Sequence, residues 1–60
     1  MSQLQTVSNA LDILEELGRA ERHLSAEDLS EILELPIGTM YRLLQTLESR
    51  GFIERYSRKE

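Results

Sequence analysis

The chain has 60 residues and a formal net charge of −4, and it contains no cysteine. A chain this short buries only about 60% of its unfolded surface, so we expect one small domain, residues 1–60, with a thin core. The lack of cysteine excludes a disulfide framework and a zinc site built on thiolates. No signal-peptide pattern and no membrane-spanning apolar run is present, which favours a cytoplasmic protein without a membrane partner.

Charge is divided unevenly along the sequence. Residues 1–35 carry two arginines and eight acidic residues, whereas residues 36–60 carry five basic and three acidic residues. Net negative charge by itself argues against a nucleic-acid ligand. The separation of charge along the chain is nevertheless compatible with one basic face that contacts phosphate while the acidic part repels it.

The first helix is expected over residues 6–17. Its apolar side chains recur at helical spacing, and they are Val7, Ala10, Leu11, Ile13, Leu14 and Leu17. The residues suited to cap its N-terminus are Thr6, Ser8 and Asn9. We expect Gly18 to cap the C-terminus, because glycine adopts the left-handed conformation without steric cost. His23, the single histidine, lies in the polar connection that follows and has no partners at metal-ligand spacing, so no metal site is predicted.

The second helix is expected over residues 26–33. Ser25 and Asp28 stand three residues apart, as in a capping box, and Leu24 just before them is expected to turn inward. The outer face of this helix is acidic. We interpret its carboxylates as a solvated surface rather than as an acid–base pair, because no pocket is indicated.

The third helix, expected over residues 37–50, carries two opposed faces. Its apolar stripe consists of Met40, Leu43, Leu44 and Leu47. The polar face consists of Thr39, Arg42, Gln45, Thr46 and Ser49. Such uncharged hydrogen-bonding groups with one guanidinium suit base edges and phosphates in a major groove. A polar surface helix without a ligand is the alternative at this point.

Pro36 biases the preceding residue away from helical angles, so the second and third helices are separated by a three-residue turn in which Leu35 packs. Gly51 is expected to cap the third helix. A short strand follows over residues 52–56, with Ile53 inward and Phe52 covering the end of the core. A lone strand leaves its backbone groups unpaired, so it either pairs with residues 23–24 or lacks a partner that follows in a longer protein.

Three segments of the sequence match the pattern of a known family: ALDILEELG, LSAEDLSEIL and LPIGTMYRLLQTLESRGFIER. They resemble the N-terminal DNA-binding domain of IclR-type bacterial transcription regulators over residues 7–56. The block from Leu-Pro to Thr-Leu is the specific part of the resemblance, and the remainder would fit many winged helix-turn-helix proteins.

The resemblance implies a mainly α fold, a three-helix winged helix-turn-helix with a short, incomplete β-wing. It also implies sequence-specific binding of double-stranded DNA with residues 37–50 in the major groove, and a homodimer in the full-length regulator. Carried over position by position, the DNA-binding residues are Gly38, Thr39, Tyr41, Arg42, Gln45 and Thr46 on the helix, with Arg58 and Lys59 on the wing side.

The sequence departs from the family pattern at three places. Ile37 and Gly38 replace a basic or polar residue and a serine, although Gly38 leaves its backbone N–H accessible to phosphate. Glu34 occupies the position where the turn usually has glycine, so we expect backbone strain of about 1 kcal/mol there. The second wing strand and the ligand-sensing domain are absent from these 60 residues, so the chain is expected to be an isolated domain or a natural miniature.

Other functions remain as alternatives. A winged helix can bind a protein instead of DNA, and Ile37 and Tyr41 beside an acidic surface would suit such a contact. Catalysis is not expected, because the sequence has neither a phosphate-binding glycine loop nor a nucleophile next to a base. Sixty residues also leave too little chain to enclose a substrate pocket. No cofactor is predicted.

Overall fold

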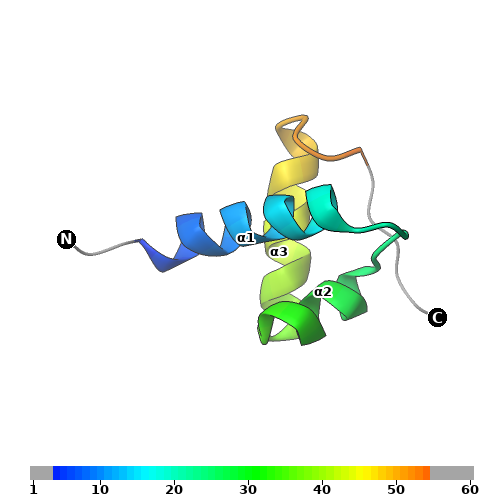
Figure 1. The fold of residues 1–60 in the computed structure, drawn as a ribbon. Helices are drawn as coiled ribbons and strands as arrows, with labels where there is room; N and C mark the ends of the chain where they lie inside the picture. The colour runs from blue at the N-terminus through cyan, green and yellow to red at the C-terminus, as the bar shows by residue number, and fades with distance from the viewer. Residues whose placement is uncertain (1–3, 55–60) are drawn as a thin grey trace.

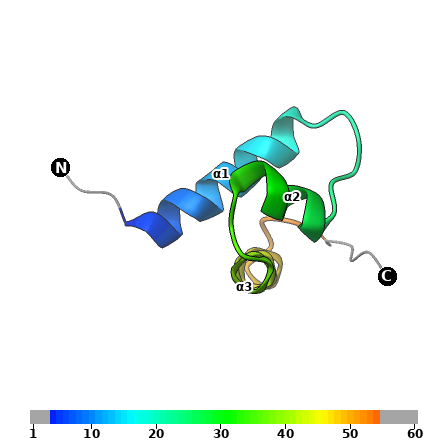
Figure 2. The same cartoon turned by 90° about the horizontal axis from the view of Figure 1, so that it is seen from below.

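The computed structural model describes residues 4–54 and contains three helices in this range: α1 (Gln5–Arg19), α2 (Ala26–Leu33) and α3 (Ile37–Ser49). In Figure 1, α3 crosses behind α1, and α2 lies beside the lower part of α3. Figure 2 shows α3 end-on, with α1 and α2 both on one side of it. Within the described residues, no helix is long and apolar enough to span a membrane.

The core lies where the three helices meet. Its buried apolar side chains are Ile13, Leu24, Ala26, Leu29, Met40, Leu43, Leu44 and Leu47. The apolar stripe predicted for the third helix is therefore confirmed, as is the inward turn of Leu24. Leu35 and Ile53 are half-buried and pack against this core, also as predicted.

The predictions for α1 are wrong in two respects. The helix begins after Leu4 without a side-chain cap and continues through Gly18 to Arg19. Arg19 donates to Glu16 at 2.7 Å, and the Ala20 backbone N–H still bonds to the Glu16 carbonyl, so the last turn is closed without a left-handed glycine. Since the helix has no capping side chain, neither Thr6, Ser8 nor Asn9 has the role expected from composition.

The buried face of α1 also differs from the expected one. Ile13 is fully buried, whereas Val7 and Leu11 are each 53% exposed and Leu4 is 75% exposed. The N-terminal half of α1 projects beyond α2 and α3, as both views show. The helices α2 and α3 therefore leave the side chains of Val7 and Leu11 largely uncovered.

The start of α2 confirms the predicted capping box. The Asp28 backbone N–H donates to Ser25 Oγ at 3.1 Å, and the Ser25 N–H donates to Asp28 Oδ2 at 2.9 Å. Arg22 adds an ion pair to the same carboxylate at 3.2 Å. The hydrogen bond from the Ser25 backbone, supported by Arg22, lowers the pKa of Asp28 from 3.8 to about 2. The carboxylate is thus held in its charged form.

This lowered pKa predicts a specific acid sensitivity of the fold. Because the folded state binds the proton more weakly than the unfolded state, Asp28 stabilises the fold fully above about pH 4 and loses that effect as pH falls toward 2. Thermal melts of wild type and Asp28→Asn should therefore differ most near neutral pH and converge toward about pH 2. A difference that stays constant with pH would contradict the charged capping role. Asp12→Asn, in the middle of α1, is the control.

The turn between α2 and α3 contains the strained residue expected from sequence. Glu34 has φ 57° and ψ 45°, in the left-handed region. The Leu35 N–H donates to the Ser30 carbonyl at 3.1 Å, and the Ser30 hydroxyl donates to the Leu35 carbonyl. Two hydrogen bonds thus hold the turn in a conformation that a glycine would adopt more easily.

Glu34→Gly is expected to stabilise the fold by up to about 1 kcal/mol, because relief of the left-handed strain exceeds the extra entropy of glycine in the unfolded chain. The measurement is a urea unfolding titration, in which the midpoint should rise while the dependence of the free energy of unfolding on urea stays unchanged. Glu31→Gly is the matched control, since Glu31 is exposed inside α2 and the same change there should cost about 1 kcal/mol. Equal destabilisation by both changes would contradict the strain at Glu34.

The C-terminus of α3 is closed by a Schellman motif. Gly51 has φ +82°, its N–H donates to Glu48 at 3.0 Å, and the Phe52 N–H donates to Leu47 at 2.9 Å. The predicted cap at Gly51 is confirmed. These bonds turn the chain away from an extended course, so residues 52–54 form no strand, and the rest of the predicted strand (55–56) lies outside the described residues. Phe52 is 66% exposed, so it does not cover the core as predicted.

Candidate nucleic-acid interface

The polar face of α3 points away from the rest of the described chain. With Met40, Leu43, Leu44 and Leu47 buried, the opposite side of the helix is left without a covering element, as the end-on view shows. Its side chains and backbone are exposed at Gly38, Arg42, Gln45 and Thr46 and half-buried at Thr39. An extended surface could therefore approach this side without displacing any helix.

Arg42 is the one basic residue within α3. Its side chain is exposed, and no salt bridge to it exists among residues 4–54. By contrast, Arg19 and Arg22 pair with Glu16 and Asp28. The guanidinium of Arg42 thus keeps its donors available for an external acceptor, whereas those of Arg19 and Arg22 are already directed at carboxylates of their own chain.

The neighbours of Arg42 on this face offer smaller polar groups. The Thr46 hydroxyl donates to the Arg42 carbonyl at 3.0 Å, and the Ser49 hydroxyl donates to the Thr46 carbonyl at 2.8 Å. Both bonds lie within the helix, so rotation of χ1 can release either hydroxyl. A Cβ placed on Gly38 would meet nothing within 4 Å. The protein itself therefore does not require glycine there, which leaves room for the close approach of a partner.

Tyr41 behaves differently from the other predicted site residues. It is half-buried, and its hydroxyl donates to Glu27 Oε2 of α2 at 2.8 Å. Its side chain is therefore directed along the α2–α3 contact. The two wing-side residues of the prediction, Arg58 and Lys59, lie outside the described residues.

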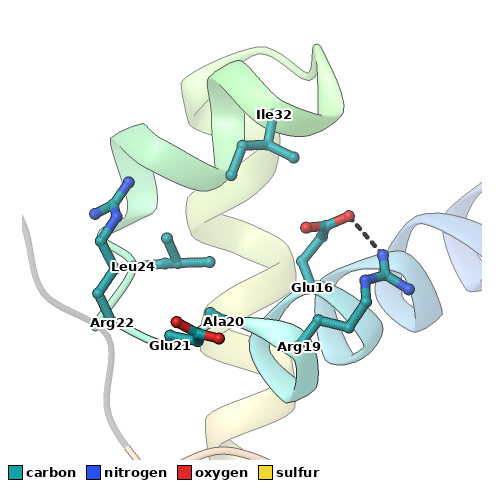
Figure 3. A pocket seen from close by; sticks show the side chains of 7 residues that line it. All are labelled: Glu16, Arg19, Ala20, Glu21, Arg22, Leu24 and Ile32. Atoms are coloured by element: carbon teal, nitrogen blue, oxygen red, sulfur yellow. Dashed lines mark hydrogen bonds and ion pairs between the residues drawn. The ribbon is translucent and has the colours of Figure 1, made fainter.

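One hollow lies away from this face, and a second borders it at Thr46. The first, of about 590 Å³, is bounded by the C-terminal end of α1, the α1–α2 connection and α2 (Figure 3). Its lining combines the Glu16–Arg19 ion pair with apolar atoms of Leu24 and Ile32 and includes no residue of α3. Among residues 4–54, no group of three or more His, Asp or Glu side chains is arranged to hold a metal ion.

The second hollow is an apolar groove of about 330 Å³ between α1, α3 and Phe52. Its walls include the exposed Val7 and Leu11, together with Leu43 and Leu47. Sequence analysis missed this exposed surface because it assigned all apolar residues of α1 to one stripe. The apolar residues at positions 4, 7, 11 and 14 form a second stripe beside the one at 10, 13 and 17. The apolar surface of the helix is therefore wider than the core needs, and this width could have indicated the exposed groove.

The helix–turn–helix formed by α2, the Glu34 turn and the outward-facing α3 defines the class of the protein: a helix-turn-helix domain. The sequence model of the IclR helix-turn-helix domain family matches residues 6–57, and the chain belongs to this family. The family is one of DNA-binding transcription regulators rather than of catalytic domains. Comparisons with curated proteins and with solved structures gave no match.

Proposed function

We propose that the chain binds double-stranded DNA sequence-specifically, with α3 in the major groove. The observation that carries the proposal is Arg42, an exposed guanidinium without a salt bridge among residues 4–54, on the uncovered side of the second helix of a helix-turn-helix. Arginine bidentate to guanine is the commonest specific contact in this groove. The established docking geometry of the motif places the N-terminal residues of the recognition helix against base edges.

The neighbouring groups extend this contact. Thr39 and Gln45 are suited to base edges, and Thr46 lies next along the same face. The backbone N–H of Gly38, in the first turn of α3, is suited to a phosphate. Arg58 and Lys59, which lie outside the described residues, are proposed to contact phosphates. Tyr41 flanks this set of residues.

A homodimer is proposed for the full-length regulator. One recognition helix reads few base pairs, so two half-sites are needed for useful affinity. The exposed Leu4, Val7 and Leu11 on the projecting half of α1 supply apolar surface that a second copy could cover. We propose a cytoplasmic location, where the bacterial chromosome lies.

Selection of bound sequences from a random duplex pool tests the proposal directly. The expected result is one enriched motif, present as two half-sites about 10 base pairs apart if two copies bind together. Recovery of unenriched sequences would refute sequence-specific binding.

A protein-interaction module is the second candidate, favoured by Ile37, which is 40% exposed at the start of α3, and by the apolar groove beside α1. Fluorescence anisotropy with random duplex at low salt separates the two candidates. Even a sequence-specific DNA-binding domain retains non-specific electrostatic affinity under those conditions. Complete absence of binding would therefore favour the protein-interaction function.

A further inference from the structure

One hydrogen bond joins α3 to α2 at a distance from the turn that connects them. The Tyr41 hydroxyl, on the second turn of α3, donates to the Glu27 carboxylate in the first turn of α2 at 2.8 Å. The two residues are 14 positions apart in the sequence, and the contact is partly buried. A hydroxyl donating to a carboxylate is a charge-assisted bond, which is stronger and shorter than a neutral one.

At the other end of α2, hydrogen bonds tie α2 to the turn that leads into α3. There Ser30 bonds to Leu35 through both its carbonyl and its hydroxyl. Glu27 and Ser30 are three residues apart and so lie on one side of α2. In addition to the packing of the core, hydrogen bonds therefore tie the helix-turn-helix together both at the turn and beyond it.

We propose that the hydrogen bond between Tyr41 and Glu27 refines the rotation of α3 about its own axis, which the buried Met40, Leu44 and Leu47 set coarsely, and so positions Arg42. A roll of α3 about its axis is expected to stretch the Tyr41 bond, which is made from within α3, more than the Ser30 bonds, which are made to Leu35 before α3 begins. Arg42 is the next residue along the helix, so its direction is fixed relative to that of Tyr41. Because a helix with its side chains is about 10–12 Å across, a roll of about 10° moves a side-chain tip by about 1 Å.

This inference rests on the proposed DNA-binding function and makes Tyr41 a positioning residue for it. Bidentate recognition of a base depends on the placement of two N–H donors, whereas attraction to phosphates depends mainly on charge. A misplaced Arg42 thus loses discrimination between sequences more than it loses general affinity. The measured quantity is therefore the ratio of affinities for the selected duplex and a scrambled duplex.

The experiment uses the 60-residue chain with its selected duplex and compares wild type, Tyr41→Phe, Glu27→Ala and the double variant. We expect each single change to lower the affinity ratio on the order of tenfold, comparable to the loss of one charge-assisted hydrogen bond. We expect the double variant to be no worse than either single change. Removing the Glu27 charge raises affinity for both duplexes alike, and the ratio cancels that effect.

Two control variants keep the test specific. Glu27→Gln retains an oxygen acceptor for the tyrosine and should keep most of the ratio. Glu31→Ala removes another carboxylate of α2, at an exposed position that makes none of the proposed DNA contacts, and should leave the ratio unchanged. Melting temperatures are measured in parallel, so that binding is compared below the transition of every variant.

Three results would overturn the inference while leaving the proposed function intact. The first is an unchanged ratio in Tyr41→Phe. The second is an equal further loss when Tyr41→Phe is added to Glu27→Ala, which would mean that the tyrosine contacts DNA on its own. The third is a parallel loss of affinity for both duplexes, as expected of a purely structural bond. A wild-type chain that selects no sequence would instead refute the proposed function and this role together.

Discussion

Arg42→Ala is expected to weaken binding of the selected duplex by about 1–3 kcal/mol and to relax the preference at one base pair. The side chain is exposed on the uncovered face of α3, and within residues 4–54 it forms no salt bridge. Its truncation therefore leaves the core untouched and removes a contact made only in the complex. The measurement is a titration of the selected duplex and of its single-base variants.

Arg19→Ala is the matched control for this prediction. It removes the same charge from an exposed arginine of α1 whose guanidinium already pairs with Glu16. We expect it to change affinity little at any sequence. Replacement of Arg58 or Lys59 should instead weaken binding to all sequences alike. Unchanged affinity and unchanged base preference in Arg42→Ala would refute the assignment of this residue.

Leu44→Ala is expected to have the largest effect on stability. Leu44 is fully buried where the three helices meet, and a change of this kind costs about 2–5 kcal/mol through lost burial and the cavity that remains. A single core in a domain of this size supplies rarely more than about 3–5 kcal/mol. Most of the variant should therefore be unfolded at room temperature, as measured by far-ultraviolet circular dichroism in a urea titration.

Leu11→Ala is the control for the core substitution. Leu11 is 53% exposed on α1, so the same chemical change should alter the free energy of unfolding by no more than about 0.5 kcal/mol. The control is measured at low protein concentration, because self-association through α1 would add to its effect. If the two leucines proved equivalent, the core would not lie at the α1–α2–α3 junction.

The parts of the fold that follow from local chemistry could be predicted from sequence. Three such features depend only on residues within one or two helical turns of each other. They are the apolar stripe around Leu44, the capping box of Ser25 and Asp28, and the left-handed conformation of Gly51. The strain at Glu34 was predicted from the family resemblance, because the turn usually has glycine where this chain has glutamate.

The features that were missed depend on contacts between elements. Which side of α1 is buried is decided by where α2 and α3 lie, and residue spacing alone does not contain that information. The bond from Tyr41 to Glu27 likewise needs the crossing of α2 and α3 before it can be recognised. Gly18 was misassigned because its own turn already has an ordinary helical hydrogen bond at Ala20 and needs no glycine.

The capping box at the start of α2 has a consequence for any DNA strand that passes it. Helix N-termini normally attract phosphate through their exposed amide protons. Here the Ser25 N–H already donates a hydrogen bond to the Asp28 carboxylate, and Glu27 adds a second carboxylate in the same turn. Arg22 compensates the charge of Asp28, so a phosphodiester arriving at this end of α2 meets the carboxylate of Glu27 in place of free amide groups. In the proposed DNA complex, we therefore expect the phosphate contacts that release counterions to come from elements other than the N-terminus of α2.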